Sequence, residues 1–156
     1  RTPTTYKACF PGGTNWMLAG NRPDAYSVDI DPGERLDGAP VLRFASTCVN
    51  PGGFGTLVAG RPVGSFRNRP VRLSAWVRGE NIKGWGGLWL RADGASGQTL
   101  AFDNMSTRPL KGTFPWQRIE MVLEIPETAA RMEFGVLLQG AGRLWFTDPE
   151  LTPHTP

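Results

Sequence analysis

Histidine and cysteine are scarce in this chain of 156 residues, which contains one histidine, His154, and two cysteines, Cys9 and Cys48. A Ser-His-Asp or Cys-His catalytic site needs a histidine within the fold, so one near the end of the chain argues against both. The same shortage argues against a structural zinc site. The cysteines form either a Cys9–Cys48 disulfide, which fits a secreted or periplasmic protein, or two small buried thiols. We favour a secreted or periplasmic location over a cytoplasmic one.

Long apolar runs and familiar catalytic motifs are also missing. No stretch approaches the roughly 20 apolar residues that span a bilayer, so we expect a soluble protein without a membrane partner. The sequence has no nucleophile elbow, phosphate-binding loop, zinc-protease helix or dinucleotide fingerprint, and we expect no cofactor. Its 17 basic residues against 14 acidic ones give a net charge of only +3, and they are scattered singly. This pattern gives little support for a nucleic-acid partner.

The residues that are present indicate strands. Twenty glycines and fourteen prolines disfavour long helices, while 40% hydrophobic residues are too many for a disordered chain. Apolar and polar residues alternate along several segments, as in half-buried strands. The clearest are 26–31, 71–78, 87–93 and 131–139, and further candidates are 5–10, 15–19, 41–48, 54–59, 99–104, 116–125 and 143–147.

Turn signals rich in glycine and proline separate these segments, among them Pro51-Gly52-Gly53 and the stretch from Gly84 to Gly87. One weak helical turn is predicted at 127–131. About ten short strands without intervening helices predict one all-β domain over 1–156, an antiparallel two-sheet sandwich with tails near 1–5 and 152–156.

Three segments resemble bacterial carbohydrate-binding modules with the galactose-binding-like jelly-roll fold. They are Tyr26-Ser-Val-Asp29 through Gly38-Ala-Pro-Val-Leu-Arg-Phe44, Val71-Arg-Leu-Ser-Ala-Trp-Val-Arg78, and Gly142-Arg-Leu-Trp-Phe-Thr-Asp148. The last strand of those modules usually closes with paired aspartates, and here Pro149 replaces the second one. Because such modules often carry a structural calcium, the resemblance implies a candidate calcium site at Asp31 or Asp148. The alternative is that these acids lie in a solvated loop and bind no metal.

A second resemblance covers 84–148. It is to an uncharacterised bacterial domain that occurs alone or attached to other modules, including some transcription regulators. The shared residues are Gly87-Leu-Trp-Leu-Arg91, Leu100-Ala-Phe-Asp-Asn-Met105, Arg108-Pro109, Gly112-Thr113 and Trp116. This resemblance informs the fold more than the activity.

Alternation also predicts a candidate binding face. Trp89 and Arg91 share one face of their strand, Glu133 and Gln139 share the polar face of another, and Asp103 and Asn104 follow a third. If these faces meet in one concave groove, an aromatic ring could stack on a sugar while amide, carboxylate and guanidinium groups bind its hydroxyls. The competing interpretation is an ordinary wet sheet face carrying weak ion pairs.

Two more tryptophans are candidates for the same groove. Trp76 points away from the aliphatic face of its strand, so it either lines the groove or is covered by a loop. Trp85 lies in a glycine-rich turn, where an aromatic ring either serves a ligand or loop contact or is exposed by chance.

Three functions remain open at this point. The leading one is a non-catalytic module that binds a carbohydrate or similar small polar molecule. A small cofactor-free enzyme could use Asp103 or Glu133 as the acid/base and Arg91 for charge stabilisation. A sensory or protein-interaction domain could instead bury Trp85 or Trp76 against another chain.

Overall fold

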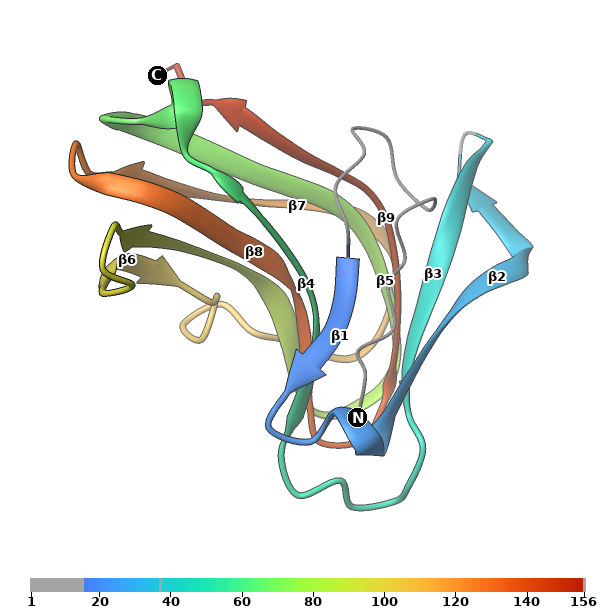
Figure 1. Ribbon diagram of the computed structural model, residues 1–156. Helices are drawn as coiled ribbons and strands as arrows, with labels where there is room; N and C mark the ends of the chain where they lie inside the picture. Colours follow the sequence, from blue (N-terminus) through green and yellow to red (C-terminus); the bar gives the residue numbers. More distant parts are fainter. Residues whose placement is uncertain (1–15, 37, 156) are drawn as a thin grey trace.

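The computed structural model describes residues 16–36 and 38–155, and within them strands dominate (Figure 1). The strands are β1 (Trp16–Gly20), β2 (Tyr26–Leu36), β3 (Ala39–Ser46), β4 (Phe54–Pro62), β5 (Arg69–Gly94), β6 (Thr99–Asp103), β7 (Leu110–Ile125), β8 (Ala129–Gln139) and β9 (Arg143–Pro153). Two 3₁₀ turns, η2 (Pro23–Ala25) and η3 (Gly64–Phe66), complete the described elements. The prediction of an all-β antiparallel fold is confirmed.

All nine described strands belong to one hydrogen-bonded sheet that curls on itself (Figure 1). The order is β1-β4-β8-β5-β9-β3-β2, and β6 and β7 pair with β5 off this path. The first part of β5 lies between β7 and β9, and its last ten residues, 85–94, pair with β8 and β6. We call β1, β4, β8, the last part of β5 and β6 the groove half. The other strands, with the first part of β5, are the β9 half.

The predicted alternation accounts for the core between the two halves. On β5, Val71, Leu73, Ala75 and Val77 are at most 1% exposed, as the pattern of 71–78 predicts. The apolar face of β8 contributes Met132, Phe134, Val136 and Leu138, which are equally part of the core.

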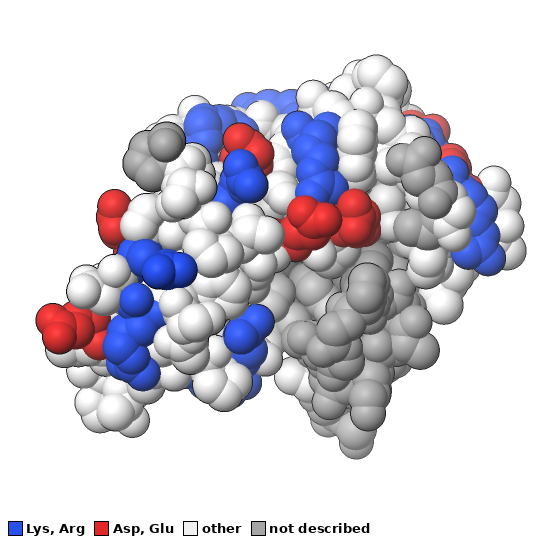
Figure 2. Space-filling view, turned by 90° about the horizontal axis from the view of Figure 1, so that it is seen from above, with Lys and Arg blue, Asp and Glu red and all other residues white. Residues whose placement is uncertain are grey.

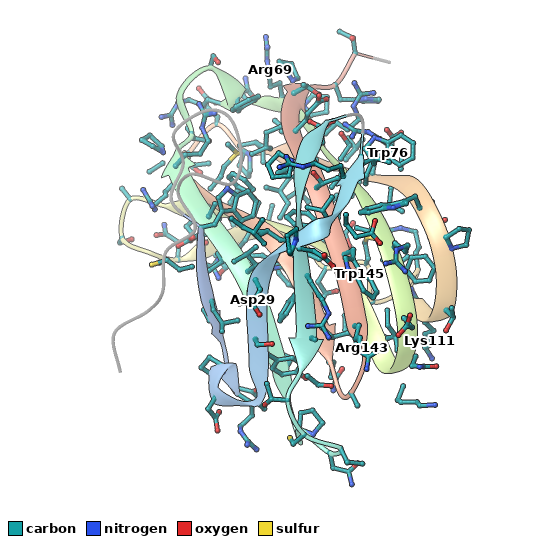
Figure 3. All side chains as sticks on the ribbon, turned by 90° about the vertical axis from the view of Figure 1, so that its right-hand side faces the viewer. Asp29, Arg69, Trp76, Lys111, Arg143 and Trp145 are labelled. Carbon is teal, nitrogen blue, oxygen red and sulfur yellow. The ribbon has the colours of Figure 1, made fainter. Side chains whose placement is uncertain are left out.

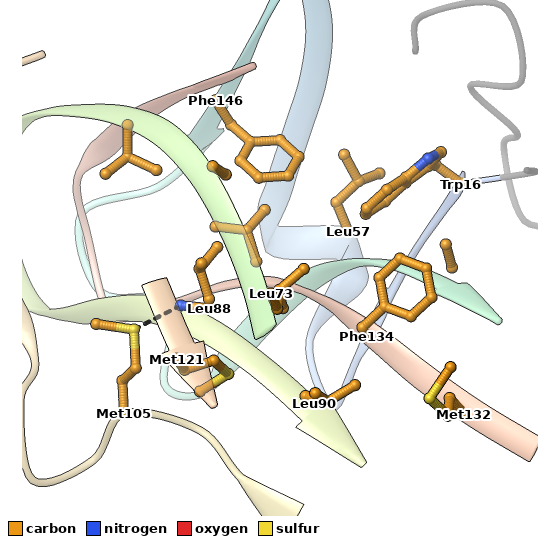
Figure 4. Close-up of a cluster of buried hydrophobic side chains, with 14 of the residues drawn as sticks. Trp16, Leu57, Leu73, Leu88, Leu90, Met105, Met121, Met132, Phe134 and Phe146 are labelled. Carbon is orange, nitrogen blue, oxygen red and sulfur yellow. Dashed lines mark hydrogen bonds between the residues drawn. The ribbon is translucent and has the colours of Figure 1, made fainter. Parts of the chain in front are cut away.

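Aromatic edges and a methionine complete this core (Figure 4). The ring of Trp16 packs edge-on against Phe134 and Phe146, with centroid separations of 5.6 and 5.8 Å. The backbone N–H of Leu88 donates to the Sδ of Met105 at 3.2 Å. That contact packs the chain after β6 against β5.

The structure corrects three details of the sequence prediction. Gly84 to Gly87 do not end a strand, because β5 runs through them with register shifts on the β7 side that let it bend. The glycine at 84 is required there, since an ideal Cβ would lie 2.1 Å from the carbonyl oxygen of Gln139. The helical turn predicted at 127–131 is a tight turn leading directly into β8.

The third correction concerns the sheets, since the two predicted sheets are one sheet joined through β5. The predicted strand at 5–10 lies outside the described residues. Among the described residues, no helix is long and apolar enough to cross a membrane.

Replacing Leu73 by alanine tests the core. Leu73 is 1% exposed, so Leu73→Ala should lower the free energy of unfolding by about 2–5 kcal/mol through the cavity it leaves. Urea unfolding followed by tryptophan fluorescence measures this. Val122→Ala, on the exposed face of β7, is the control and should cost far less. Equal losses in the two variants would contradict the assignment of Leu73 to the core.

Candidate functional site

A groove of about 520 Å³ crosses the outward face of the groove half, on the side away from the core. All five strands of that half contribute to it. The lining residues used below are Met17 from β1, Phe54 and Thr56 from β4, Glu133 and Gln139 from β8, Trp85, Trp89 and Arg91 from β5, and Phe102 and Asn104 from β6 and the residue after it. Grooves of this size bind small molecules.

Trp89 forms the floor of the groove. Its Nε1–H donates to the Oγ1 of Thr56 at 2.7 Å, although Thr56 belongs to β4 and β8 lies between the two strands. Neighbouring strands lie about 4.8 Å apart, so the indole must reach across β8 to make this bond. Gly135 is the β8 residue paired with Trp89, and its lack of a side chain leaves the space free.

The indole is therefore a fixed and nearly buried surface. An ideal Cβ on Gly135 would lie 2.0 Å from the carbonyl oxygen of Leu57, so a larger residue has no room there. The hydroxyl of Thr56 in turn donates to the carbonyl of Val136 at 2.8 Å. Only 8% of Trp89 is exposed. Trp89 thus offers less stacking surface than the sequence suggested.

One wall carries the charged groups. The guanidinium of Arg91 donates to Asp93 from Nε at 2.9 and 3.2 Å and from Nη2 at 3.0 Å. Glu133 lies directly opposite Arg91 in the sheet register, and its Oε1 is 3.9 Å from Nη2 of Arg91. Asp93 is 8% exposed, so Arg91 is held by a largely buried carboxylate.

Trp85 and Gln139 form one end of the groove. They are paired in the sheet register, and the Nε1–H of Trp85 donates to the Oε1 of Gln139. The hydroxyl of Tyr26 lies 3.1 Å from the carbonyl oxygen of Gly53 and 2.8 Å from that of Gly140. Tyr26 therefore ties together the two turns next to this end of the groove.

Apolar side chains stand at both edges of the groove. Phe102, on β6, is 51% exposed, and its ring centroid lies 6.5 Å from that of Trp89. Met17, on β1, is 38% exposed. Since β1 and β6 are the outermost strands of this half, the groove has an apolar residue on each side of the Trp89 floor.

The structure brings together most of the residues predicted to share a groove. Those that line it are Trp85, Trp89, Arg91, Asn104, Glu133 and Gln139. Asp103 does not line it, because Asp103 pairs with Leu90 and so lies on the opposite face of the sheet from Phe102. Its carboxylate accepts from the backbone N–H of Met105 and from Arg108, each at 3.0 Å. Trp76 lies on the β9 half (Figure 3), where the guanidinium of Arg118 is 6.0 Å from its ring.

Sequence reasoning missed the contributions of β1 and β4. Phe54 and Thr56 alternate with buried residues in a segment that was predicted as a strand, but nothing in the sequence places that strand beside β8. Phe102 was not predicted as a groove residue, although alternation puts its side chain on the opposite face from Ala101 and Asp103. An exposed aromatic residue on a predicted edge strand is the signal that could have found it.

The candidate calcium ligands have protein partners instead. Asp31 accepts from the indole of Trp145 at 2.9 Å, and this bond, with one from the backbone of Gly33, lowers the pKa of the Asp31 carboxyl. Asp148 pairs with Arg118 at 3.3 Å. In the described part of the chain, no group of three or more His, Cys, Asp or Glu side chains is placed to hold a metal ion.

The disulfide prediction involves Cys9, which lies outside the described residues; Cys48 is exposed after β3. Surface charge gives no further site on the face shown in Figure 2, where basic and acidic side chains lie interspersed. A nucleic-acid footprint would need a concentrated basic patch on that face.

The contact of the Tyr26 hydroxyl with the two turns can be tested by the pH dependence of stability. Burial raises the pKa of Tyr26 to about 12, from the ordinary value near 10. Between these values the unfolded chain ionises first, so the free energy of unfolding should fall as pH rises from about 10 to 12. Tyr26→Phe should remove this part of the fall and cost about 1 kcal/mol at pH 7 through the lost hydrogen bond.

Urea unfolding of both proteins from pH 8 to pH 11.5 checks this. Because other groups also titrate at high pH, the difference between the two curves is the relevant quantity. Parallel curves would show that the Tyr26 phenol is not shielded from solvent.

No family model matches the chain. Among curated proteins it is similar to the uncharacterised HTH-type transcriptional regulator YbfP of Bacillus subtilis (strain 168), with 34% identity over 131 residues. The match covers 83% of this chain but 44% of that regulator, so the chain spans less than half the length of this relative.

Solved structures with a similar fold include several carbohydrate-binding modules. The C-terminal family 22 module of Clostridium thermocellum Xyn10B aligns with a TM-score of 0.62 and 14% identity, over 88% of this chain and 85% of that one. A family 61 module, solved in complex with β-1,4-galactotriose, aligns with a TM-score of 0.54 and 15% identity, over 89% and 88%. The enzymatically active domain of bacteriophage CBA120 tailspike protein 4 has a TM-score of 0.64 at 15% identity, over 89% of this chain and 19% of that one. The chain therefore has the fold of carbohydrate-binding modules, as the sequence resemblance predicted.

Proposed function

We propose that this chain is a non-catalytic ligand-binding domain whose ligand is a carbohydrate bound in the groove. The observation that carries the proposal is the combination of aromatic and hydrogen-bonding side chains along one groove of about 520 Å³. The fold of carbohydrate-binding modules supports it. Under this proposal the two halves of the curled sheet act as the two layers of a jelly roll, and β5 passes from one layer to the other.

The aromatic contacts come from Phe102 and Trp85. Phe102 presents an exposed ring at the edge of the groove, and Trp85 is half-buried at its end with its N–H already bonded to Gln139. The faces of such rings pack against the C–H surface of a pyranose. Trp89 contributes the floor between them.

The polar side chains offer groups of both kinds to sugar hydroxyls. The Oε1 of Gln139 accepts from Trp85, which leaves the amide NH₂ free to donate into the groove. Asn104 is arranged in the same way, because its Oδ1 accepts from the backbone of Ser106 at 3.1 Å. The Glu133 carboxylate supplies acceptors. Since a hydroxyl both donates and accepts, a sugar can satisfy all three.

Hydrolysis fits this groove less well than binding. Among the described residues that line it, Glu133 is the one acid. Glycoside hydrolysis by paired carboxylates needs two of them about 5–10 Å apart across the scissile bond. Asp103, the second acid predicted from the sequence, is committed to Arg108 and the Met105 backbone.

A sensory role is the second candidate, and it is compatible with the first. The observation that favours it is the similarity to an HTH-type transcriptional regulator more than twice as long as the matched segment. In a longer chain of that kind, a domain that binds a sugar would report its presence to an attached module.

Removing the exposed aromatic ring tests the proposal. Phe102→Ala should weaken glycan binding at least tenfold, since stacking contacts of this kind contribute on the order of 1 kcal/mol beyond area burial. Stability should change little because the ring is 51% exposed. Isothermal titration with β-1,4-galactotriose, xylohexaose and a panel of other neutral oligosaccharides measures the affinity.

Val122→Ala serves as the matched control, since it removes an exposed apolar side chain from β7 on the other half of the molecule. Saturable binding that keeps its affinity in this variant and is weakened at least tenfold in Phe102→Ala is the expected result. Absence of binding to every glycan by the unmodified protein would refute the proposed function.

A further inference from the structure

We infer that the groove selects neutral oligosaccharides and discriminates against acidic ones, because the Asp93 carboxylate already occupies the arginine that could recognise a ligand carboxylate. This inference rests on the proposed function and deepens it. It assigns Asp93, which does not line the groove, a role in ligand selection.

The first step concerns the geometry of the pair. Arg91 and Asp93 lie two residues apart on β5 and therefore on the same face of the sheet. Their contact has two donor nitrogens on two acceptor oxygens, the arrangement by which arginine recognises carboxylates. Side-chain exposure is 12% for Asp93 and 35% for Arg91, so the acid lies underneath and the base faces the groove.

The second step concerns the other charges nearby. Glu133 lies across from Arg91, with its Oε1 3.9 Å from the guanidinium. The other oxygen of Glu133 faces Gly60, where the Nη2 of Arg131 is also close, since both lie within 3 Å of the position that a Gly60 Cβ would occupy. Among the described residues that line the groove, Arg91 is the one basic residue, and carboxylate oxygens of both Asp93 and Glu133 lie within ion-pair distance of it.

A ligand carboxylate would meet two obstacles on this wall. The positive charge of Arg91 is already compensated by Asp93, so the N–H groups that remain on Arg91 would attract an anion only weakly. The ligand carboxylate would also approach the like charge of Glu133. A neutral hydroxyl meets neither obstacle, because it can accept from an N–H of Arg91 and donate to Glu133 with the pair intact.

The test compares ligands that differ only in charge. The probes are β-1,4-galactotriose and other neutral hexose oligosaccharides, the same oligosaccharides oxidised at C6 to uronates, and the methyl esters of those uronates. We expect the neutral forms to bind at least tenfold more tightly than the uronates at low salt. Esterification should restore most of the affinity, since it removes the charge and keeps the added atoms.

Asp93→Asn should reduce the ratio of neutral to uronate affinity at least tenfold, chiefly by improving uronate binding. The reason is that the isosteric amide removes the negative charge that compensates Arg91. Glu124→Gln is the matched control: it changes the net charge equally but lies exposed on β7, away from the groove, and should leave the preference unchanged. Thermal unfolding verifies the fold of each variant. Glu133→Gln removes a charge from the same wall and should shift the preference in the same direction, so it carries the test if Asp93→Asn does not fold.

The outcomes separate the two proposals. Uronates that bind the unmodified protein as tightly as the neutral forms overturn the charge inference and leave the binding function standing. The charge inference is also overturned if neither Asp93→Asn nor Glu133→Gln changes the ratio of neutral to uronate affinity. Failure of every probe to bind refutes the function itself, and the inference with it.

Discussion

The two sets of hydrogen bonds made by β5 determine the rest of this structure. The strand pairs with β7 and β9 along its first part and with β8 and β6 along its last, so the sheet has to turn where these partners change. Turning encloses the core between the halves and leaves the opposite face of the groove half free. Residues of β5 then alternate between the two, with Leu88 and Leu90 in the core and Trp89 and Arg91 at the groove.

This arrangement makes the floor of the groove part of the packed structure. Trp89 is bonded to Thr56 across Gly135, and Thr56 is bonded to the backbone of Val136. A ring fixed on three strands loses little freedom when a ligand covers it, which favours affinity. Because Trp89 is nearly buried, the proposed function assigns stacking to Phe102 and Trp85 at the margins of the groove. In that proposal Trp89 provides rigidity, and the two flanking rings provide contact.

Much of the fold, and part of the groove, could be predicted from the sequence. Alternation identifies the face on which a side chain lies, and Arg91 and Glu133, which it predicts to lie on the polar faces of their strands, both line the groove. It does not identify the neighbouring strand, so the contributions of β1 and β4 were missed. Alternation within 99–104 puts Asp103 on the face opposite Phe102, so Asp103 lies away from the groove, where its carboxylate pairs with Arg108. Glycine is favoured both in turns and where a strand bends, so the sequence alone could not distinguish the two at Gly84, and a turn was predicted there.

The charge pattern of the groove follows from the same alternation. Residues two apart on a strand share a face, so Asp93 can pair with Arg91 within β5. Cross-strand pairing then adds Glu133 opposite Arg91. With the charge of Arg91 compensated, the groups that can bind a ligand are the amides of Gln139 and Asn104, the remaining N–H groups of Arg91 and the acceptors of Glu133. Such a set matches hydroxyl groups better than ions, so the polarity of the groove and the neutral ligand inferred for it have one physical origin.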